Sequence, residues 1–146
     1  MAASNALWVL GHKVTHVETI GDYSLAEVSV TPGVPGPPFH YHIDATKLFH
    51  VIEGTLDVRH EGEWHTLKQG ESLIVPKDAV HTFRNVTQNP SRFMTTWSPK
   101  GFEGFFLEFG VPVGYTDAFN KSISEEMVHR VKEGCGKYGM IVVESG

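Results

Sequence analysis

Residues 35–54 read PGPPFHYHIDATKLFHVIEG, and this stretch decides how we interpret the fold. Two histidines, His40 and His42, follow a proline- and glycine-rich entry and stand two residues apart. Because residues i and i+2 of a β-strand point to the same face, both imidazoles are expected to project to one side. The spacing alone is a weak signal, since a histidine in a strand is more often a surface residue or a satisfied core residue.

A second block of similar character lies further along the chain. Gly70 precedes the apolar run Ser72–Val75, and after a proline and a short turn His81 opens the sequence HTFRN. Two imidazoles from one strand and a third from a later strand are a common way for a β-barrel to hold a divalent metal. The two blocks together therefore predict a metal site formed by His40, His42 and His81.

The bulk composition excludes several classes of function. The 146 residues are 40% hydrophobic and 20% charged, as expected for a globular chain long enough to bury a core. A formal charge of −5 argues against nucleic acid or an anionic membrane as partner. One cysteine, Cys135, rules out an intrachain disulfide framework and fits a reducing compartment. The apolar run at residues 6–10 is too short for a signal peptide, so we expect a cytoplasmic protein.

The central part of the chain has the spacing of a β-sandwich or barrel. Short strands are predicted at residues 7–10, 14–20, 23–30, 47–53, 55–60, 63–67, 73–75, 81–86, 92–97 and 140–143. The segment TPGVPGPP, residues 31–38, cannot be a central strand, because proline has no backbone N–H to donate to a neighbouring strand. We interpret the segment as an ordered loop. His60 and His65 flank the predicted hairpin around Gly62 and are expected to be exposed.

Two stretches near the C-terminus have helical periodicity instead. Apolar residues recur at i, i+3, i+4 and i+7 over residues 102–109, where four phenylalanines form the stripe. A second helix is predicted over Ile123–Glu133, because residues 122–125 match a capping box. Its inner face is expected to hold Ile123, Met127, Val128 and Val131.

The two histidine blocks resemble the paired motifs of the cupin superfamily. The first family pattern is His-x-His, four residues, Glu, six residues, Gly, and the second is Gly, five residues, Pro-x-Gly, two residues, His, three residues, Asn. This chain matches the spacing of both, with Asp78 in the place of the second pattern's second glycine and Asn85 at its end. The entry PGPP and the sequence GFEGFF at residues 101–106 are similar to bacterial cupins of the quercetin dioxygenase type.

The resemblance implies an all-β fold, a double-stranded β-helix or jelly-roll barrel with one or two short C-terminal helices. It implies one cupin domain over residues 1–146, with a barrel core at about 23–110 and a helical extension at about 111–146. Family members commonly pair, so a homodimer is expected.

Lys47 departs from the family pattern, because it stands where cupins carry a metal-binding glutamate. An ammonium repels a dication and offers no lone pair until it loses its proton. Three interpretations follow. A metal sits on the three histidines alone, as in cysteine dioxygenase-like cupins; or Lys47 and the histidines bind an anion without metal; or Lys47 turns away to a surface acid such as Asp44 or Glu53. In the first interpretation Lys47 lies on the same barrel wall as the histidines and weakens metal binding.

The function implied is that of a small cupin whose histidine-rich site holds Fe, Ni, Zn or Mn and acts on a small organic molecule, with dioxygenase-type chemistry as the enzyme hypothesis. The alternative is a non-catalytic or metal-free cupin that binds a small anionic ligand through Lys47 and the barrel histidines. The residues expected to contact the ligand are Lys47, Phe39, Phe83, Asn85 and Phe93.

Overall fold

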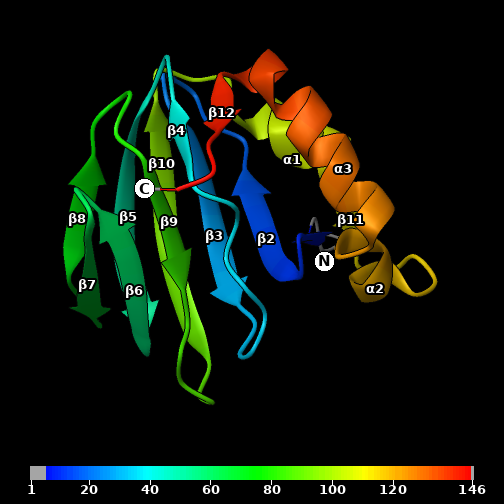
Figure 1. Ribbon diagram of the computed structural model, residues 1–146, viewed down its shortest axis with the longest axis horizontal. Coiled ribbons are helices and arrows are strands. Elements are labelled where there is room, and N and C mark those ends of the chain that lie inside the picture. Colours follow the sequence, from blue (N-terminus) through cyan, green and yellow to red (C-terminus); the bar gives the residue numbers. More distant parts are fainter. Residues whose placement is uncertain (1–5, 146) are drawn as a thin grey trace.

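The computed structural model describes residues 6–145, which form two facing β-sheets with helices along one side (Figure 1). The larger sheet has seven strands in the order β11-β1-β2-β3-β10-β5-β8. Its strands are β1 (Ala6–Val9), β2 (His12–Val17), β3 (Ser24–Val30), β5 (Thr46–Glu53), β8 (Ser72–Val75), β10 (Ser91–Ser98) and β11 (Val111–Pro112). All described pairings in this sheet are antiparallel.

The smaller sheet has five strands in the order β12-β4-β9-β6-β7. Its strands are β4 (His40–His42), β6 (Thr55–His60), β7 (Glu63–Lys68), β9 (His81–Arg84) and β12 (Met140–Val142). Both sheets have an inner face of buried residues that alternate with more exposed ones, as along β3 and β10 of the larger sheet and β4 of the smaller. The predicted two-sheet, jelly-roll fold and the ten predicted strand positions are confirmed, with small differences in bounds.

Two tight turns explain features of the sequence motifs. Gly54, between β5 and β6, has φ +72°, and a Cβ there would lie 2.3 Å from the carbonyl oxygen of Pro90. Only glycine fits such a close approach. Asp78 takes the place of a family glycine and has φ +68°, a left-handed conformation that Asp tolerates better than most residues do. The turn before His81 is therefore kept although the glycine is absent.

The core fills the space between the two sheets and is strongly aromatic. Phe49, Phe83 and Phe93 are buried and pack with ring centroids 5.1–6.1 Å apart. Trp97 and Phe102 continue this cluster towards the helices with their rings stacked at 4.7 Å. Such offset and edge-on contacts add to the free energy gained by removing the rings from water.

Helices cover one side of the sheets, next to β2 and β12 in Figure 1. They are α1 (Glu103–Phe109), α2 (Ala118–Ser122), α3 (Glu125–Gly134) and the 3₁₀ helix η1 (Cys135–Tyr138). The aromatic stripe predicted for residues 102–109 is confirmed, since Phe105, Phe106 and Phe109 are buried on the inner face of α1. Within residues 6–145, no helix is long and apolar enough to cross a membrane.

The predicted start of the last helix was wrong by two residues. The N-cap is Ser124, whose hydroxyl accepts a hydrogen bond from the Met127 amide at 3.1 Å. Ser122 instead ends α2 and is buried, where its hydroxyl accepts from the Gly11 amide at 3.1 Å. Ile123 therefore precedes α3 and is 40% exposed, whereas Met127 and Val131 are buried as expected.

The predicted exposure of His60 was also wrong. His60 is buried, because its register in β6 places it directly opposite His81 of β9 on the inner face of the smaller sheet. His65 of β7 is half-buried and its ring centroid lies 6.4 Å from that of His60.

Candidate metal centre

The short strand β4 carries two of the three predicted ligands. It lies between β12 and β9, with His40 paired to His81 and His42 paired to Met140. The alternation of a strand turns both β4 histidines inward and Tyr41 outward. The final strand β12 therefore completes the sheet that holds the site.

The three histidines converge inside the fold. One nitrogen from each of His40, His42 and His81 lies within 4.8 Å of the corresponding nitrogens of the other two. Their ring centroids are 4.3–5.3 Å apart, and all three side chains are buried. Metal–imidazole bonds of about 2.0–2.2 Å require ligand nitrogens no more than about 4.4 Å apart, so the three side chains lie close to the spacing that one shared metal needs. The predicted clustering of the three histidines inside the fold is confirmed.

Backbone carbonyl groups fix the ring orientation of two of the ligands. The Nδ1 atom of His40 lies 2.8 Å from the Pro38 carbonyl oxygen, and that of His81 lies 3.0 Å from the Ala79 carbonyl oxygen. A carbonyl oxygen only accepts, so each Nδ1 carries the proton and each Nε2 keeps its lone pair. This arrangement orients and polarises a metal-binding imidazole.

Several nitrogens in the cluster have no partner in the described part of the chain. These are Nε2 of His81 and both ring nitrogens of His42, all of which are shielded from solvent. Buried polar atoms without a partner cost free energy unless something satisfies them. A divalent metal would satisfy Nε2 of His81 and one of the two ring nitrogens of His42, so the residues fit the group that the sequence motif implies.

Burial keeps the three imidazoles neutral. It lowers the pKa of His40 to about 3 and the pKa of His42 to about 2, and it also lowers the pKa of His81. The nearby Lys47 cation lowers each of these pKa values as well. A neutral imidazole has the free lone pair that coordination requires.

Lys47 lies on the sheet opposite the histidines, which corrects the prediction of a shared wall. It belongs to β5 of the seven-stranded sheet, where it pairs with Trp97 and Val75, whereas the histidines belong to the five-stranded sheet. Lys47 is buried and does not reach Asp44 or Glu53, which excludes the third interpretation of this residue.

Aromatic rings surround the Lys47 ammonium group. Its Nζ lies 4.5 Å from the ring centroid of Phe49, 4.8 Å from that of Trp97 and 5.8 Å from that of Phe83. Cation–π attraction offsets part of the cost of burial. Neither a hydrogen bond nor an ion pair to Nζ exists within residues 6–145. Burial lowers the pKa of Lys47 to about 7, so the neutral amine and the ammonium coexist near neutral pH.

A mostly apolar cavity of about 60 Å³ adjoins the cluster, and the ring of Phe83 and that of Phe93 form part of its wall. His40, His42 and Lys47 are also part of this wall. Among the described residues that line the cavity there is no carboxylate.

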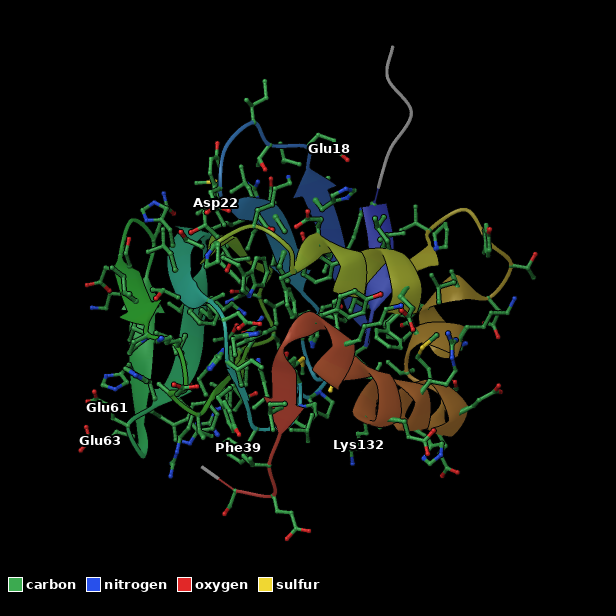
Figure 2. The ribbon with its side chains drawn as sticks, turned by 90° about the horizontal axis from the view of Figure 1, so that it is seen from above. Glu18, Asp22, Phe39, Glu61, Glu63 and Lys132 are labelled. Carbon is green, nitrogen blue, oxygen red and sulfur yellow. The ribbon has the colours of Figure 1, made fainter. Side chains whose placement is uncertain are left out.

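Two of the predicted ligand-contacting residues lie elsewhere. Phe39 points away from the cavity, because it precedes the inward-facing His40, and it borders a shallow surface depression with Lys132 (Figure 2). Asn85 organises a turn, since its amide donates to the Asn89 carbonyl at 2.8 Å and its side-chain oxygen accepts from the Thr87 amide at 3.0 Å. Neither side chain lines the cavity.

Sequence reasoning did not single out some residues of the cavity wall. Thr95 and Trp97 face inward from β10, next to the predicted Phe93, and could have been found by the alternation of that strand. His12 also lines the cavity, where its Nε2 donates to the Pro35 carbonyl and its Nδ1 accepts from the Thr31 amide. No local signal indicated that His12 holds the start and the middle of the proline-rich loop.

Comparison with known families agrees with the motifs. Residues 26–97 match the cupin domain family, and the chain belongs to the cupin superfamily. Polyketide synthase CurC of Streptomyces cyaneus is 37% identical over 60 residues, which are 41% of this chain and 39% of that protein. Quercetin 2,3-dioxygenase of Bacillus subtilis is 32% identical over 73 residues, 50% of this chain and 21% of that enzyme. The chain thus spans well under half of either relative.

Solved structures share the fold at low sequence identity. An RmlC-like cupin from Shewanella frigidimarina superposes with a TM-score of 0.58 at 21% identity, over 66% of this chain and 85% of that one. KdgF from Halomonas superposes with a TM-score of 0.57 at 22% identity, over 62% of this chain and 80% of that one. These likenesses establish the architecture of the two sheets.

Proposed function

We propose that His40, His42 and His81 bind one divalent transition metal and that the site acts on a small organic anion, with dioxygenase-type chemistry. The observation that carries this proposal is the buried cluster itself, in which two rings are oriented by backbone carbonyl groups and the inner nitrogens of His42 and His81 have no other partner within residues 6–145. A bound metal of this kind supplies Lewis acidity and, for a metal such as iron, one-electron redox chemistry.

The charge of the site supports an anionic substrate. Three neutral imidazoles leave the full charge of a dication in place, and the Lys47 ammonium adds to it. The cavity wall contains no carboxylate from residues 6–145 that would offset this charge. Uncompensated charge in a buried site is costly, so a carboxylate, enolate or phenolate group is the ligand that this environment favours.

The chain's own residues would then orient the substrate. Lys47, on the opposite sheet from the histidines, would pair with the anionic group, while Phe83, Phe93 and Trp97 contact the apolar part of the molecule. The same rings exclude water from the reacting groups, which strengthens each electrostatic contact.

The size of the cavity limits the substrate. A volume of about 60 Å³ holds roughly four or five water molecules. A small acid is therefore the substrate class that we propose, since a cavity that holds a benzene ring has a volume of about 150 Å³. The relationship to quercetin 2,3-dioxygenase supports oxygen chemistry, but it covers only 21% of that enzyme, so its substrate does not transfer to this chain.

Lys47 also supports a second candidate function, a metal-free cupin that binds a small anion. A buried ammonium group without an ion-pair partner in the described structure is a site for a carboxylate or phosphate. In this case Lys47 would carry the charge that binds the anion, and among the three histidines His42 would donate a hydrogen bond to it, because the Nδ1 protons of His40 and His81 are donated to backbone carbonyl groups.

Metal content and oxygen uptake distinguish the two candidates. The purified protein would be analysed for bound metals, reconstituted without oxygen with Fe²⁺, Ni²⁺, Zn²⁺ or Mn²⁺, and assayed with an oxygen electrode against small carboxylic acids, enols and phenols. His42→Ala is the informative variant, because neither ring nitrogen of His42 has a protein partner to lose. His129→Ala, on the exposed surface of α3, is the matched control. We expect one metal per chain in the wild type and control and none in His42→Ala; equal metal content in all three would refute the proposed centre.

A further inference from the structure

The metal cluster borders two separate spaces. One is the apolar interior cavity already described, and the other is an outer cleft of about 160 Å³ whose wall includes Asp44, Lys100 and Tyr138. His42 and Phe102 belong to the walls of both. We propose that this outer cleft is the route by which small ligands reach the metal centre, and that the Phe102 ring determines by size which ligands pass. The route serves the proposed function but can be tested without any metal.

The packing of Phe102 places its ring as a partition between the two spaces. Its ring meets that of His42 edge-on at 4.8 Å, and on other sides it stacks with Trp97 at 4.7 Å and with Phe105 at 5.0 Å. Phe102 is buried, so the outer cleft ends at this ring. A rotation of this one side chain would join the cleft to the interior.

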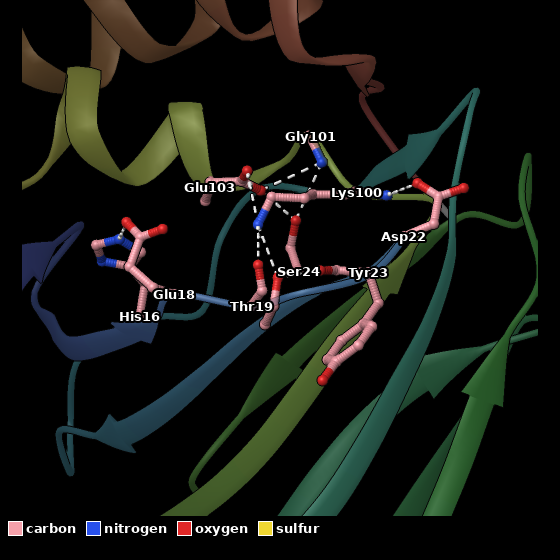
Figure 3. Close-up of polar contacts among 9 residues, drawn as sticks. All are labelled: His16, Glu18, Thr19, Asp22, Tyr23, Ser24, Lys100, Gly101 and Glu103. Atoms are coloured by element: carbon pink, nitrogen blue, oxygen red, sulfur yellow. Dashed lines mark hydrogen bonds and ion pairs between the residues drawn. The ribbon is translucent and has the colours of Figure 1, made fainter.

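Hydrogen bonds hold the backbone on either side of Phe102, so the side chain is the part that can move. The Gly101 amide donates to the Ser24 hydroxyl at 3.1 Å, and the Ser24 hydroxyl donates to the Glu103 carboxylate (Figure 3). The Lys100 amide donates to an Asp22 carboxylate oxygen at 3.1 Å. The loop that carries Phe102 is thus tied to β3 and to the turn before it.

A competing route exists at the other end of the cavity. A second depression, of about 340 Å³, lies between the proline-rich loop and α3, and its wall includes Val34, Ile123 and Val131. It shares only Leu10 with the interior cavity and includes none of the three histidines. The cleft at Phe102 reaches a metal ligand directly, and this favours it as the route.

The cleft is expected to select by size more than by charge. Lys100 pairs with Glu103 at 3.6 Å, and Lys137 pairs with Glu108 at 3.5 Å. Both lysines are therefore largely neutralised, and exposed pairs of this kind steer ligands weakly at physiological salt.

The test measures access to a buried position inside the cavity. Thr95 is fully buried and lines the cavity, so Thr95→Cys places a thiol there. The natural Cys135 is removed by Cys135→Ser in the same background. Metal-free protein would be treated with methyl methanethiosulfonate and with its benzyl analogue, and labelling would be followed by mass spectrometry.

In this background Phe102→Ala is expected to raise the labelling rate about tenfold or more and to remove the preference for the smaller reagent, because a packed ring no longer blocks the passage. Leu10→Ala is the matched control at the competing route and is expected to leave both rates within about twofold of the background. Phe102→Leu, which keeps an apolar side chain, provides a second variant if Phe102→Ala does not fold.

Three results would overturn the inference. These are faster labelling in Leu10→Ala alone, equal acceleration in both variants, and no acceleration in either. Because no metal is present in this measurement, absence of metal binding would refute the proposed function and leave the access route standing.

Discussion

The Lys47 ammonium nitrogen lies 4.5 Å from the centre of the Phe49 ring, two residues along the same strand. This contact puts a cation in an aromatic surrounding at the position where cupins carry a carboxylate ligand, and it faces the three histidines from the opposite sheet. Burying a cation without a counterion lowers the stability of the folded protein. It affects the stability of the fold and the affinity for metal in ways that separate experiments can measure.

The first prediction concerns stability and pH. The pKa of Lys47 is lowered to about 7 in the folded protein, whereas the unfolded chain keeps the usual value near 10.4. Between these two pH values the unfolded state binds more protons, so the free energy of unfolding rises with pH. Below about pH 7 Lys47 is protonated in both states, and burying its charge lowers the free energy of unfolding by roughly 5 kcal/mol.

Lys47→Met removes this destabilisation by the buried charge while keeping a side chain of similar length. Urea unfolding from pH 6 to 10 should show the variant more stable than the wild type at pH 6, with the gap closing as the pH rises. Lys68→Met, at an exposed position of β7, is the control and should follow the wild type throughout. If the free energy of unfolding changes with pH in the same way for wild type and Lys47→Met, Lys47 keeps its proton in the folded protein over this pH range.

The second prediction concerns the approach to β4. A Cβ on Gly36 would lie 1.7 Å from the Phe83 carbonyl oxygen, because the proline-rich loop packs tightly against β9. Gly36→Ala should therefore destabilise the fold by about 3 kcal/mol or more, since backbone must move to relieve the clash. Gly114→Ala, where a Cβ would meet nothing within 4 Å, is the control. Equal melting temperatures for the two variants would show that the loop is not docked.

The third prediction concerns helix α3. Val131 is fully buried on its inner face, and Val131→Asp should lower the free energy of unfolding by roughly 3–5 kcal/mol, because the new charge has no partner there. His129→Asp, two residues earlier on the exposed face, should cost less than about 1 kcal/mol. Chemical denaturation of both variants gives the comparison, and similar losses would mean that α3 does not pack on the sheets.

The features that could be predicted from the sequence are the local ones. Alternation along a strand is fixed by backbone geometry, so His40 and His42 could be assigned to one face, and the spacing of the second motif brought in His81. The stripe of phenylalanines predicted α1 for the same reason. Each of these conclusions depends on residues a few positions apart.

The features that could not be predicted depend on which strands become neighbours. The opposite placement of Lys47 follows from the pairing of β5 with β10 and β8, and the burial of His60 follows from its register with His81. Neither pairing has a local signal. The N-cap was misassigned for another reason, because Ser122 and Ser124 are both good capping residues, and the bond from the Gly11 amide to Ser122 is a long-range contact.

The last prediction concerns metal affinity and the residue at position 47. A unit charge about 4 Å from another costs roughly 4 kcal/mol at an effective dielectric constant near 20. Lys47→Met removes that repulsion, and Lys47→Glu removes it and also adds an anionic oxygen ligand opposite the three histidines. We therefore expect affinity for Zn²⁺, Ni²⁺ or Fe²⁺ to rise from wild type to Lys47→Met and again to Lys47→Glu, by about 100-fold or more in total. Calorimetric titration with elemental analysis of the three proteins measures each step separately.

Equal affinities for Lys47→Met and Lys47→Glu would show that a carboxylate at this position does not reach the metal. If all three proteins bind no metal, the histidines are not a metal site; the metal-free candidate then predicts that wild type binds a small carboxylate and that Lys47→Met does not.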